Sequence, residues 1–275
     1  MFPKPGYRSL RLATAGLLLL VGCGAEEDDA GRDEPPPPTD YMLLTISGHC
    51  FVGCADFNEE YLVDEGTAQV LADALPDADG EVLIGGAVDS YWSWVDGDDN
   101  IVAVGFVDLV AFLEALVDDW PEKTPNETAV VVACHSHGCV WLHTALIAVP
   151  RLEIAALVDI DAESYEWEWE WADEIADHDT DWGWDIGNAE SGWEVDGLSE
   201  LQDVEDLVPG NVGLNLEIVS DDGTWIQDGD PNHRMDDGSE RRIEQFYSVE
   251  NHEDSDGPNS DGISWAADRL AEELR

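Results

Sequence analysis

The chain has 275 residues, of which 63 are acidic and 11 are basic, so its formal net charge at pH 7 is −52. A field of this sign repels nucleic acid and anionic membrane surfaces, which excludes direct binding to polyanions. We interpret the charge as a heavily solvated surface suited to salty surroundings, and a cationic partner is the alternative.

The first 22 residues have the composition of an export signal. Lys4, Arg8 and Arg11 come before or at the start of an apolar run from Leu12 to Val21, which is the charge order of a signal peptide. The run is shorter than the roughly 20 residues that span a bilayer, and no later stretch is long and apolar enough to do so. We therefore expect residues 1–22 to take no part in the fold.

The end of this segment, Leu20-Val21-Gly22-Cys23, resembles the lipobox of bacterial lipoproteins. In that family the cysteine is lipidated and becomes the mature N-terminus. The resemblance implies an exported protein that is anchored through Cys23 to a bacterial membrane, at the outer membrane or the cell surface. An ordinary secretory signal with an incidental cysteine is the alternative.

Residues 23–40 are acidic and then proline-rich, which predicts an extended tether that forms no core. The remaining residues, 41–275, are enough for one domain with a large core. Within them, apolar runs typical of strands alternate with segments of helical periodicity. The expected strands are 41–46, 81–87, 129–134, 154–160, 212–220 and 242–249, and the expected helices are 59–75, 102–120, 139–149 and 262–274. This alternation predicts an α/β fold with a mainly parallel sheet and helices on both faces.

Two segments interrupt the alternation. The acidic cluster at 96–100 could bind Ca²⁺, but the twelve-residue calcium loop with its closing glutamate is incomplete, so we expect a solvated loop over 89–100. Residues 163–209 contain tryptophan alternating with glutamate and few aliphatic side chains. We predict that this insertion is an acidic, Trp-rich cap that offers indole surface to an apolar substrate. The alternative is an excursion whose tryptophans pack on their own domain.

The clearest candidate for chemistry is Ser136. The apolar run from Ala129 changes abruptly into an apolar helical segment at this serine, which His135 and His137 flank and Gly138 follows. A tight turn from strand to helix exposes the serine hydroxyl at its apex. A serine becomes a nucleophile when a base takes its proton and a third group orients that base.

His252 is the predicted base. It follows the last expected strand, and the carboxyl ends of parallel strands meet at one edge of the sheet, where Ser136 also lies. Candidate acids follow two other strands. The remaining candidates for these roles are His233 as the base and Asp221, Asp222, Asp228, Asp159 and Asp161 as the acid.

The order serine, acid, histidine and the motif Cys134-His135-Ser136-His137-Gly138 resemble the α/β-hydrolase family, in particular its smaller esterases and lipases. Asp222-Gly223-Thr224-Trp225 is similar to the acid loop of lipases, so the resemblance ranks Asp222 first and Asp221 second; some members of the family instead place the acid after the preceding strand. Cys134 stands where the family usually has glycine. The resemblance covers 41–275 as topology and only a few residues as motif.

The resemblance implies a serine hydrolase that cleaves small-molecule or lipid esters through an acyl-enzyme, without a cofactor or metal. It also implies backbone N–H donors for the oxyanion, from His137 and from His49 or Cys50 in the loop after the first strand. The sequence leaves open whether amides are cleaved too.

A different function remains open, because histidine and cysteine are unusually dense at 49–54 and 134–143 and both bind zinc. His135-Ser136-His137 is similar to the start of the zinc motif of metallo-β-lactamase-like hydrolases, but the aspartate and histidine that should follow are missing. A zinc-binding exported lipoprotein is therefore the alternative, and a hydrolase fold without activity is a third reading. Cys50, Cys54, Cys134 and Cys139 allow three disulfide pairings, with a plain buried thiol at Cys134 as the alternative.

Overall fold

The computed structural model describes residues 41–48, 61–76, 82–89, 93–95, 101–103, 106–119, 129–163, 192–220 and 231–274. These residues belong to the compact unit Pro36–Arg275. The predicted signal, lipidation site and tether lie outside them. So do His49, Cys50, Cys54, Asp221, Asp222 and Asp228.

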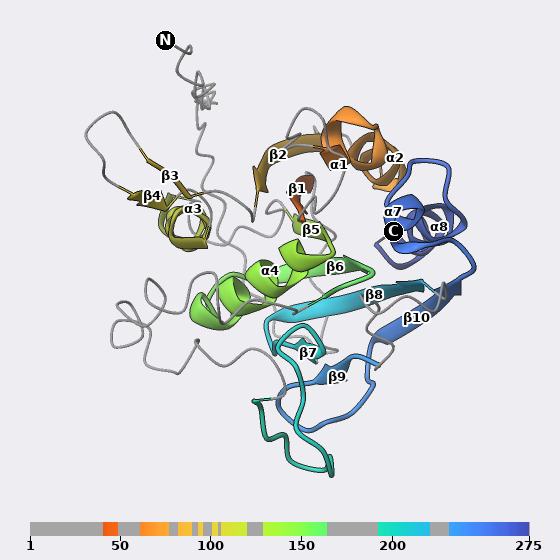
Figure 1. Ribbon diagram of the computed structural model, residues 1–275. Helices are drawn as coiled ribbons and strands as arrows, with labels where there is room; N and C mark the ends of the chain where they lie inside the picture. Colours follow the sequence, from red (N-terminus) through yellow and green to blue (C-terminus); the bar gives the residue numbers. More distant parts are fainter. Residues whose placement is uncertain are drawn as a thin grey trace, which may run out of the picture. The chain divides into compact units, whose positions relative to one another are not determined.

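A six-stranded sheet in the order β10-β8-β6-β5-β1-β2 is the centre of this unit (Figure 1). Every neighbouring pair in it is parallel. The predicted mainly parallel sheet is therefore confirmed. The strands are β1 (Tyr41–Ser47), β2 (Val82–Asp89), β5 (Ala129–His135), β6 (Ile154–Ile160), β8 (Val212–Ser220) and β10 (Ile243–Ser248).

Helices cover both faces of the sheet, as the sequence predicts. Because successive side chains of a strand point to opposite faces, Leu43 of β1 packs in a core with residues of α2 and α8. Leu44 packs in a second core with α3 and α4. Burial on both faces explains why these strands are apolar throughout. The helices are α1 (Tyr61–Asp64), α2 (Thr67–Ala74), α3 (Phe106–Asp119), α4 (His137–Ala148), α7 (His252–Ser255) and α8 (Asp261–Glu273).

Two expected elements differ from the structure. The helix predicted over 59–75 is divided into α1 and α2 at Gly66, whose φ of 97° lies in the left-handed region that glycine adopts readily. The helix predicted from residue 102 begins only at Phe106. Residues Ile101–Ala103 instead form β4, antiparallel to β3 (Ser93–Val95) within the segment where we expected a loop.

The described part of the predicted cap, residues 192–209, lies beside the main sheet. Its short strand β7 (Leu207–Val208) pairs in parallel with β9 (His233–Arg234). Trp193 forms an antiparallel bridge with Gln202 and packs against the core that α3 and α4 share. This tryptophan therefore packs on its own domain, while residues 164–191 lie outside the described part of the chain.

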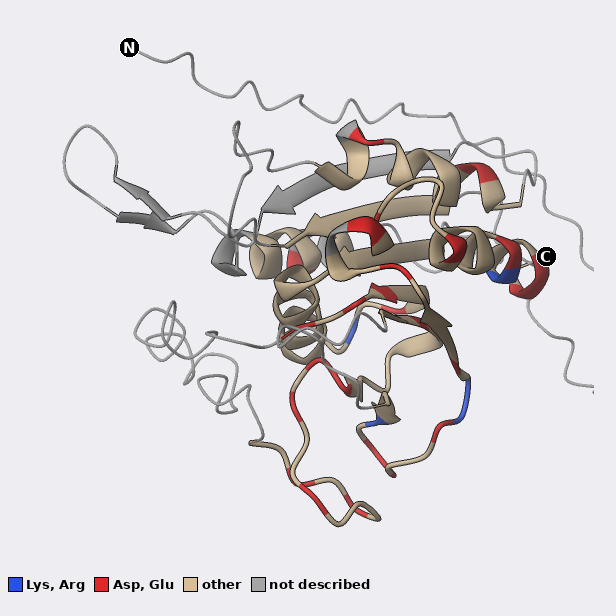
Figure 2. Ribbon diagram, turned by 45° about the vertical axis from the view of Figure 1, so that its right-hand side comes forward, with Lys and Arg blue, Asp and Glu red and all other residues tan. Residues whose placement is uncertain are grey.

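Acidic residues are spread over helices and loops, with few basic residues among them (Figure 2). This even distribution fits the interpretation of a solvated acidic surface better than a single patch for a cationic partner. Within the described ranges, no helix has both the length and the apolar character that crossing a bilayer requires.

Candidate active site

Ser136 is the single residue between the end of β5 and the start of α4. Its φ of 54° and ψ of −136° are unusual for a residue with a side chain. The surrounding structure holds this conformation: the Ser136 N–H donates to the carbonyl of Ile160 at 3.0 Å, and the Ser136 carbonyl accepts from Cys139 N–H at 2.9 Å. A strained turn of this kind is the geometry that places a nucleophile at the end of a strand. Ser136 is only 5% exposed, so the predicted exposure of its hydroxyl is not seen.

Two glycines allow the loop after β1 to contact this turn directly. A Cβ atom on Gly48 would lie 2.5 Å from the carbonyl oxygen of His135 and 2.7 Å from the Cβ of Ser136. A Cβ on Gly138 would lie 2.6 Å from the carbonyl oxygen of Ser47. Since no side chain fits at these separations, the close approach of the two loops depends on glycine at both positions.

The imidazole of His252 joins Ser136 to Asp161. Its Nε2 lies 2.8 Å from Ser136 Oγ, and its Nδ1 lies 2.5 Å from Asp161 Oδ2. A carboxylate accepts hydrogen bonds, so Nδ1 carries the proton and Nε2 accepts from the serine hydroxyl. Ser136 and Asp161 directly follow β5 and β6, and His252, the first residue of α7, follows β10. The carboxyl ends of these parallel strands lie at the same edge of the sheet.

Asp161 is itself held by the neighbouring strand. Its Oδ1 accepts the backbone N–H of Ser220 at 2.8 Å, and its Oδ2 accepts the hydroxyl of Ser220 at 2.5 Å. Burial alone would raise the pKa of Asp161, but its hydrogen bonds with His252 and Ser220 and the charge of His252 outweigh burial, so its pKa is lowered. The carboxylate therefore stays ionised opposite His252.

The pKa of His252 shifts in the opposite direction. Burial alone would lower it, but the hydrogen bond to Asp161 and the negative charge of that residue raise the pKa above its ordinary value of 6.5. The arrangement thus strengthens His252 as a proton acceptor.

The carboxylate that hydrogen-bonds to His252 is that of Asp161, which the sequence analysis ranked behind Asp222. β6 and β8 are neighbours in the sheet, and candidate acids follow both strands. The lipase-like context of Asp222 favours the acid after β8. Asp222 lies outside the described residues. His233, the other candidate base, lies in β9 beside β7.

The predicted oxyanion donors are only partly described. His137 is the first residue of α4, directly after Ser136, and N–H groups in the first turn of a helix have no acceptor within it. His49 lies outside the described residues. The preceding N–H, that of Gly48, donates to the hydroxyl of Tyr61 at 2.6 Å.

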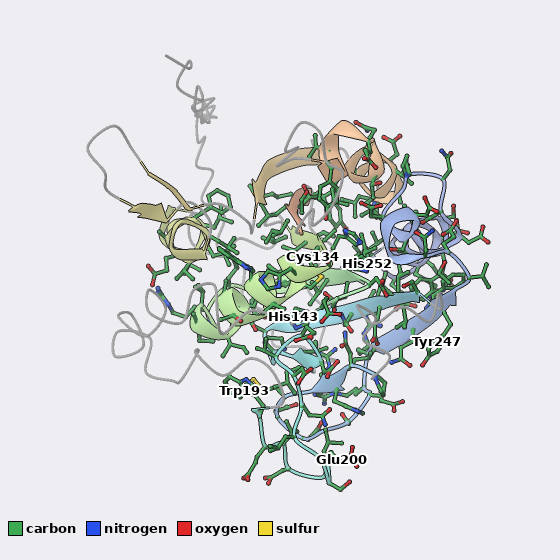
Figure 3. The ribbon with its side chains drawn as sticks, viewed as in Figure 1. Cys134, His143, Trp193, Glu200, Tyr247 and His252 are labelled. Carbon is green, nitrogen blue, oxygen red and sulfur yellow. A yellow bond between two sulfur atoms is a disulfide. The ribbon has the colours of Figure 1, made fainter. Side chains whose placement is uncertain are left out.

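Among the described residues of the zinc alternative, Cys134, Cys139 and His143 do not have the contacts of metal ligands. Cys134 and Cys139 form a disulfide, so although their sulfur atoms and an Asp159 oxygen lie within 4.8 Å of one another, they supply no thiolate. The ring nitrogens of His143 lie 2.9 Å from the carbonyl oxygen of Leu207 and 2.9 Å from Asp159 Oδ1. Figure 3 shows Cys134 and His252 near the end of β5, and His143 further along α4.

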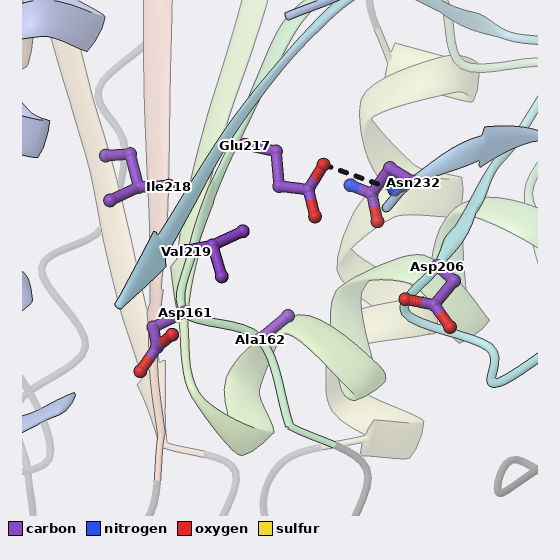
Figure 4. Close-up of a pocket in the computed structure, with 7 residues that line it drawn as sticks. All are labelled: Asp161, Ala162, Asp206, Glu217, Ile218, Val219 and Asn232. Carbon is purple, nitrogen blue, oxygen red and sulfur yellow. Dashed lines mark hydrogen bonds between the residues drawn. The ribbon is translucent and has the colours of Figure 1, made fainter. Parts of the chain in front are cut away.

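A small pocket lies beside Asp161 (Figure 4). Within it, Glu217 accepts a hydrogen bond from the backbone N–H of Asn232 at 3.2 Å. Neither Ser136 nor His252 lines this pocket, so we do not assign it to the acyl group of a substrate. Its lining residues are Asp161, Ala162, Asp206, Glu217, Ile218, Val219 and Asn232.

No model of a known protein family matches the sequence, and no curated protein matches it.

Several solved structures resemble this structure in fold. The NocB thioesterase domain, in a covalent complex with a fluorophosphonate nocardicin G analogue, is 14% identical with a TM-score of 0.40, over 88% of this chain and 97% of that chain. Est1E from Butyrivibrio proteoclasticus, with ferulic acid bound, is 16% identical with a TM-score of 0.43, over 87% and 91%. An esterase from the archaeon Pyrobaculum calidifontis is 13% identical with a TM-score of 0.42, over 88% and 76%. Because these similarities are low, the function proposed below rests on the geometry of the site.

Proposed function

We propose that this protein is a serine hydrolase of the α/β-hydrolase family that cleaves carboxylic esters through an acyl-enzyme. The observation that carries the proposal is the hydrogen-bonded series Ser136, His252 and Asp161. Its members come from three separate strand ends and have the order and contacts that activate a serine hydroxyl.

In the proposed reaction, Ser136 Oγ attacks the ester carbonyl while His252 Nε2 takes the hydroxyl proton. Asp161 stays ionised and stabilises the imidazolium, the role that the sequence analysis gave to Asp222. The N–H groups of His137 and His49 stabilise the oxyanion. When the tetrahedral intermediate collapses, His252 returns the proton to the leaving alcohol. A water molecule then releases the acid by the same steps.

Labelling with a fluorophosphonate probe tests the nucleophile. We expect the wild type to be labelled, Ser136→Ala to be unlabelled, and His252→Ala to lose ester hydrolysis by several orders of magnitude. Ser264→Ala, which changes an exposed serine of α8, is the matched control and should be labelled like the wild type. Unchanged labelling of Ser136→Ala would overturn the assignment. So would stoichiometric zinc together with chelator-sensitive activity that resists serine reagents.

The substrate panel should contain oxygen esters of increasing acyl length and the corresponding thioesters, which differ from them only in the leaving group. Serine attack on either carbonyl uses the same groups, so the ratio of kcat/KM values measures the preference for the leaving group.

We also propose that the protein is exported and lipid-anchored, because Leu20-Val21-Gly22-Cys23 is similar to a lipobox. Radiolabelled palmitate should be incorporated into the full chain and recovered in the membrane fraction. Cys23→Ser should lose both the label and the membrane location. Labelling of Cys23→Ser at the wild-type level would contradict the anchor.

A further inference from the structure

A continuous series of hydrogen bonds connects the residue after β1 with the start of α1, the end of β5 and the start of α7. The backbone N–H of Gly48 donates to Tyr61 Oη at 2.6 Å, and Tyr61 Oη lies 2.6 Å from His135 Nδ1. On the other side of the same ring, His135 Nε2 lies 3.1 Å from the backbone carbonyl oxygen of His252. Neither Tyr61 nor His135 has a part in the mechanism above.

The donor and the acceptor of each hydrogen bond in this series can be assigned. A carbonyl oxygen only accepts, so His135 Nε2 carries a proton and donates it to the His252 carbonyl. Burial, together with the charge of His252, lowers the pKa of His135 to about 3, so the ring is neutral and Nδ1 has no proton. The Tyr61 hydroxyl therefore donates to Nδ1, which leaves its oxygen to accept from Gly48.

The hydrogen-bonded residues come from separate parts of the fold. Gly48 belongs to the loop that leads to the proposed oxyanion donor His49, and His135 directly precedes Ser136. The rings of His135 and His252 also lie close together, with centroids 4.8 Å apart. Among the described residues, Asp256 also faces this ring, with Oδ2 3.7 Å from His135 Nδ1.

We propose that Tyr61 and His135 are positioning residues of the hydrolase, which hold the backbone at Gly48, the nucleophile and the base in place without touching the substrate. The inference rests on the proposed function. The Gly48 N–H is engaged by Tyr61, so it is not the oxyanion donor of the proposed mechanism. A displacement of a fraction of an ångström at Gly48 or Ser136 would weaken binding of the transition state more than binding of the substrate.

Tyr61→Phe removes only the hydroxyl and tests the proposal. We expect kcat to fall about 10- to 100-fold with KM changed less than about twofold, because the lost contact holds the backbone at Gly48. A trifluoromethyl ketone transition-state analogue should bind more weakly by the same factor. Tyr41→Phe is the matched control, since the Tyr41 hydroxyl donates to the carbonyl of Leu274 away from the loops of the site. It should change the melting temperature about as much as Tyr61→Phe while kcat stays at the wild-type value.

Two substitutions of His135 separate its contacts. Gln in place of His135 keeps an N–H donor toward the His252 carbonyl, whereas Leu keeps none, so kcat should be about tenfold or more higher in His135→Gln than in His135→Leu. Equal kcat values in these two variants, or an unchanged kcat in Tyr61→Phe, would overturn the positioning role. If the wild type is neither labelled by a fluorophosphonate nor active on esters, the proposed function fails and the positioning role fails with it. A labelled, active wild type with an unaffected Tyr61→Phe overturns only the positioning role.

Discussion

Asp161 Oδ2 lies 2.5 Å from Nδ1 of His252, although the two residues are 91 positions apart in the chain. The contact depends on the backbone of Asp161, whose φ of 44° is in the left-handed region that residues with side chains seldom adopt. Ser220 holds the carboxylate in this orientation through two hydrogen bonds. The acid of the site is thus fixed by neighbours on both sides.

Replacing Asp161 with Asn should lower kcat for ester hydrolysis by about 10³- to 10⁴-fold, because the amide no longer stabilises the correct tautomer and the imidazolium. Asp222→Asn is the informative comparison, and we expect it to change kcat by less than about threefold. Steady-state kinetics of the two variants decide between them. A large loss in Asp222→Asn with a small one in Asp161→Asn would transfer the role of the acid to Asp222.

The pH profile of kcat/KM should show an acidic limb with its midpoint above pH 6.5. The pKa of His252 is raised by Asp161, so the imidazole keeps its proton to a higher pH and becomes a base only above it. In Asp161→Asn the cause of the shift is removed, and the midpoint should move to lower pH while the activity falls. A midpoint that stays in place in this variant would mean that Asp161 does not set the titration of His252.

Alanine at Gly48 or Gly138 should disable the site. Each new Cβ would lie closer than 3 Å to backbone atoms. Relieving such overpacking costs about 1–3 kcal/mol or displaces the turn at Ser136. We expect ester hydrolysis to fall more than about 100-fold in both variants. Gly210→Ala is the control, because a Cβ there has nothing within 4 Å, and it should keep full activity. A fully active Gly48→Ala would show that the two loops can separate without harm.

Removing His143 should destabilise the fold rather than the chemistry. Burial would lower the pKa of His143, but the charge of Asp159 and the hydrogen bond to it raise the pKa, which favours an ion pair between these two fully buried side chains. His143→Ala leaves the Asp159 carboxylate buried without its cation, at a cost of about 3–5 kcal/mol in the free energy of unfolding. Urea denaturation measures this loss.

The control for this prediction is Arg241→Ala, which breaks an exposed pair with Asp236 at 4.0 Å. It should change the free energy of unfolding by less than about 1 kcal/mol. Equal losses in the two variants would show that His143 does not stabilise Asp159.

Much of the fold could be predicted from the sequence, because strands buried on both faces are apolar throughout and their neighbours alternate with helices. That topology also brought Ser136 and His252 to one edge of the sheet. The contact of Asp161 with the histidine could not be predicted, since candidate acids follow two adjacent strands and local motifs do not encode the turn that directs Asp161 toward His252. No sequence pattern predicted the role of Tyr61 either, because its contact with His135 joins residues that are 74 positions apart.

The disulfide between Cys134 and Cys139 has a consequence for how the protein is made. Both residues are completely shielded from solvent, on either side of Ser136. Because an oxidant needs access to the sulfurs, we expect this bond to form while the chain is folding, before α4 packs onto the sheet. A chain that folds in a reducing cytoplasm should enclose two thiols beside Asp159 and resist later oxidation to the disulfide form. The compartment in which the chain folds, rather than the buffer in which the protein is later assayed, decides which form is obtained.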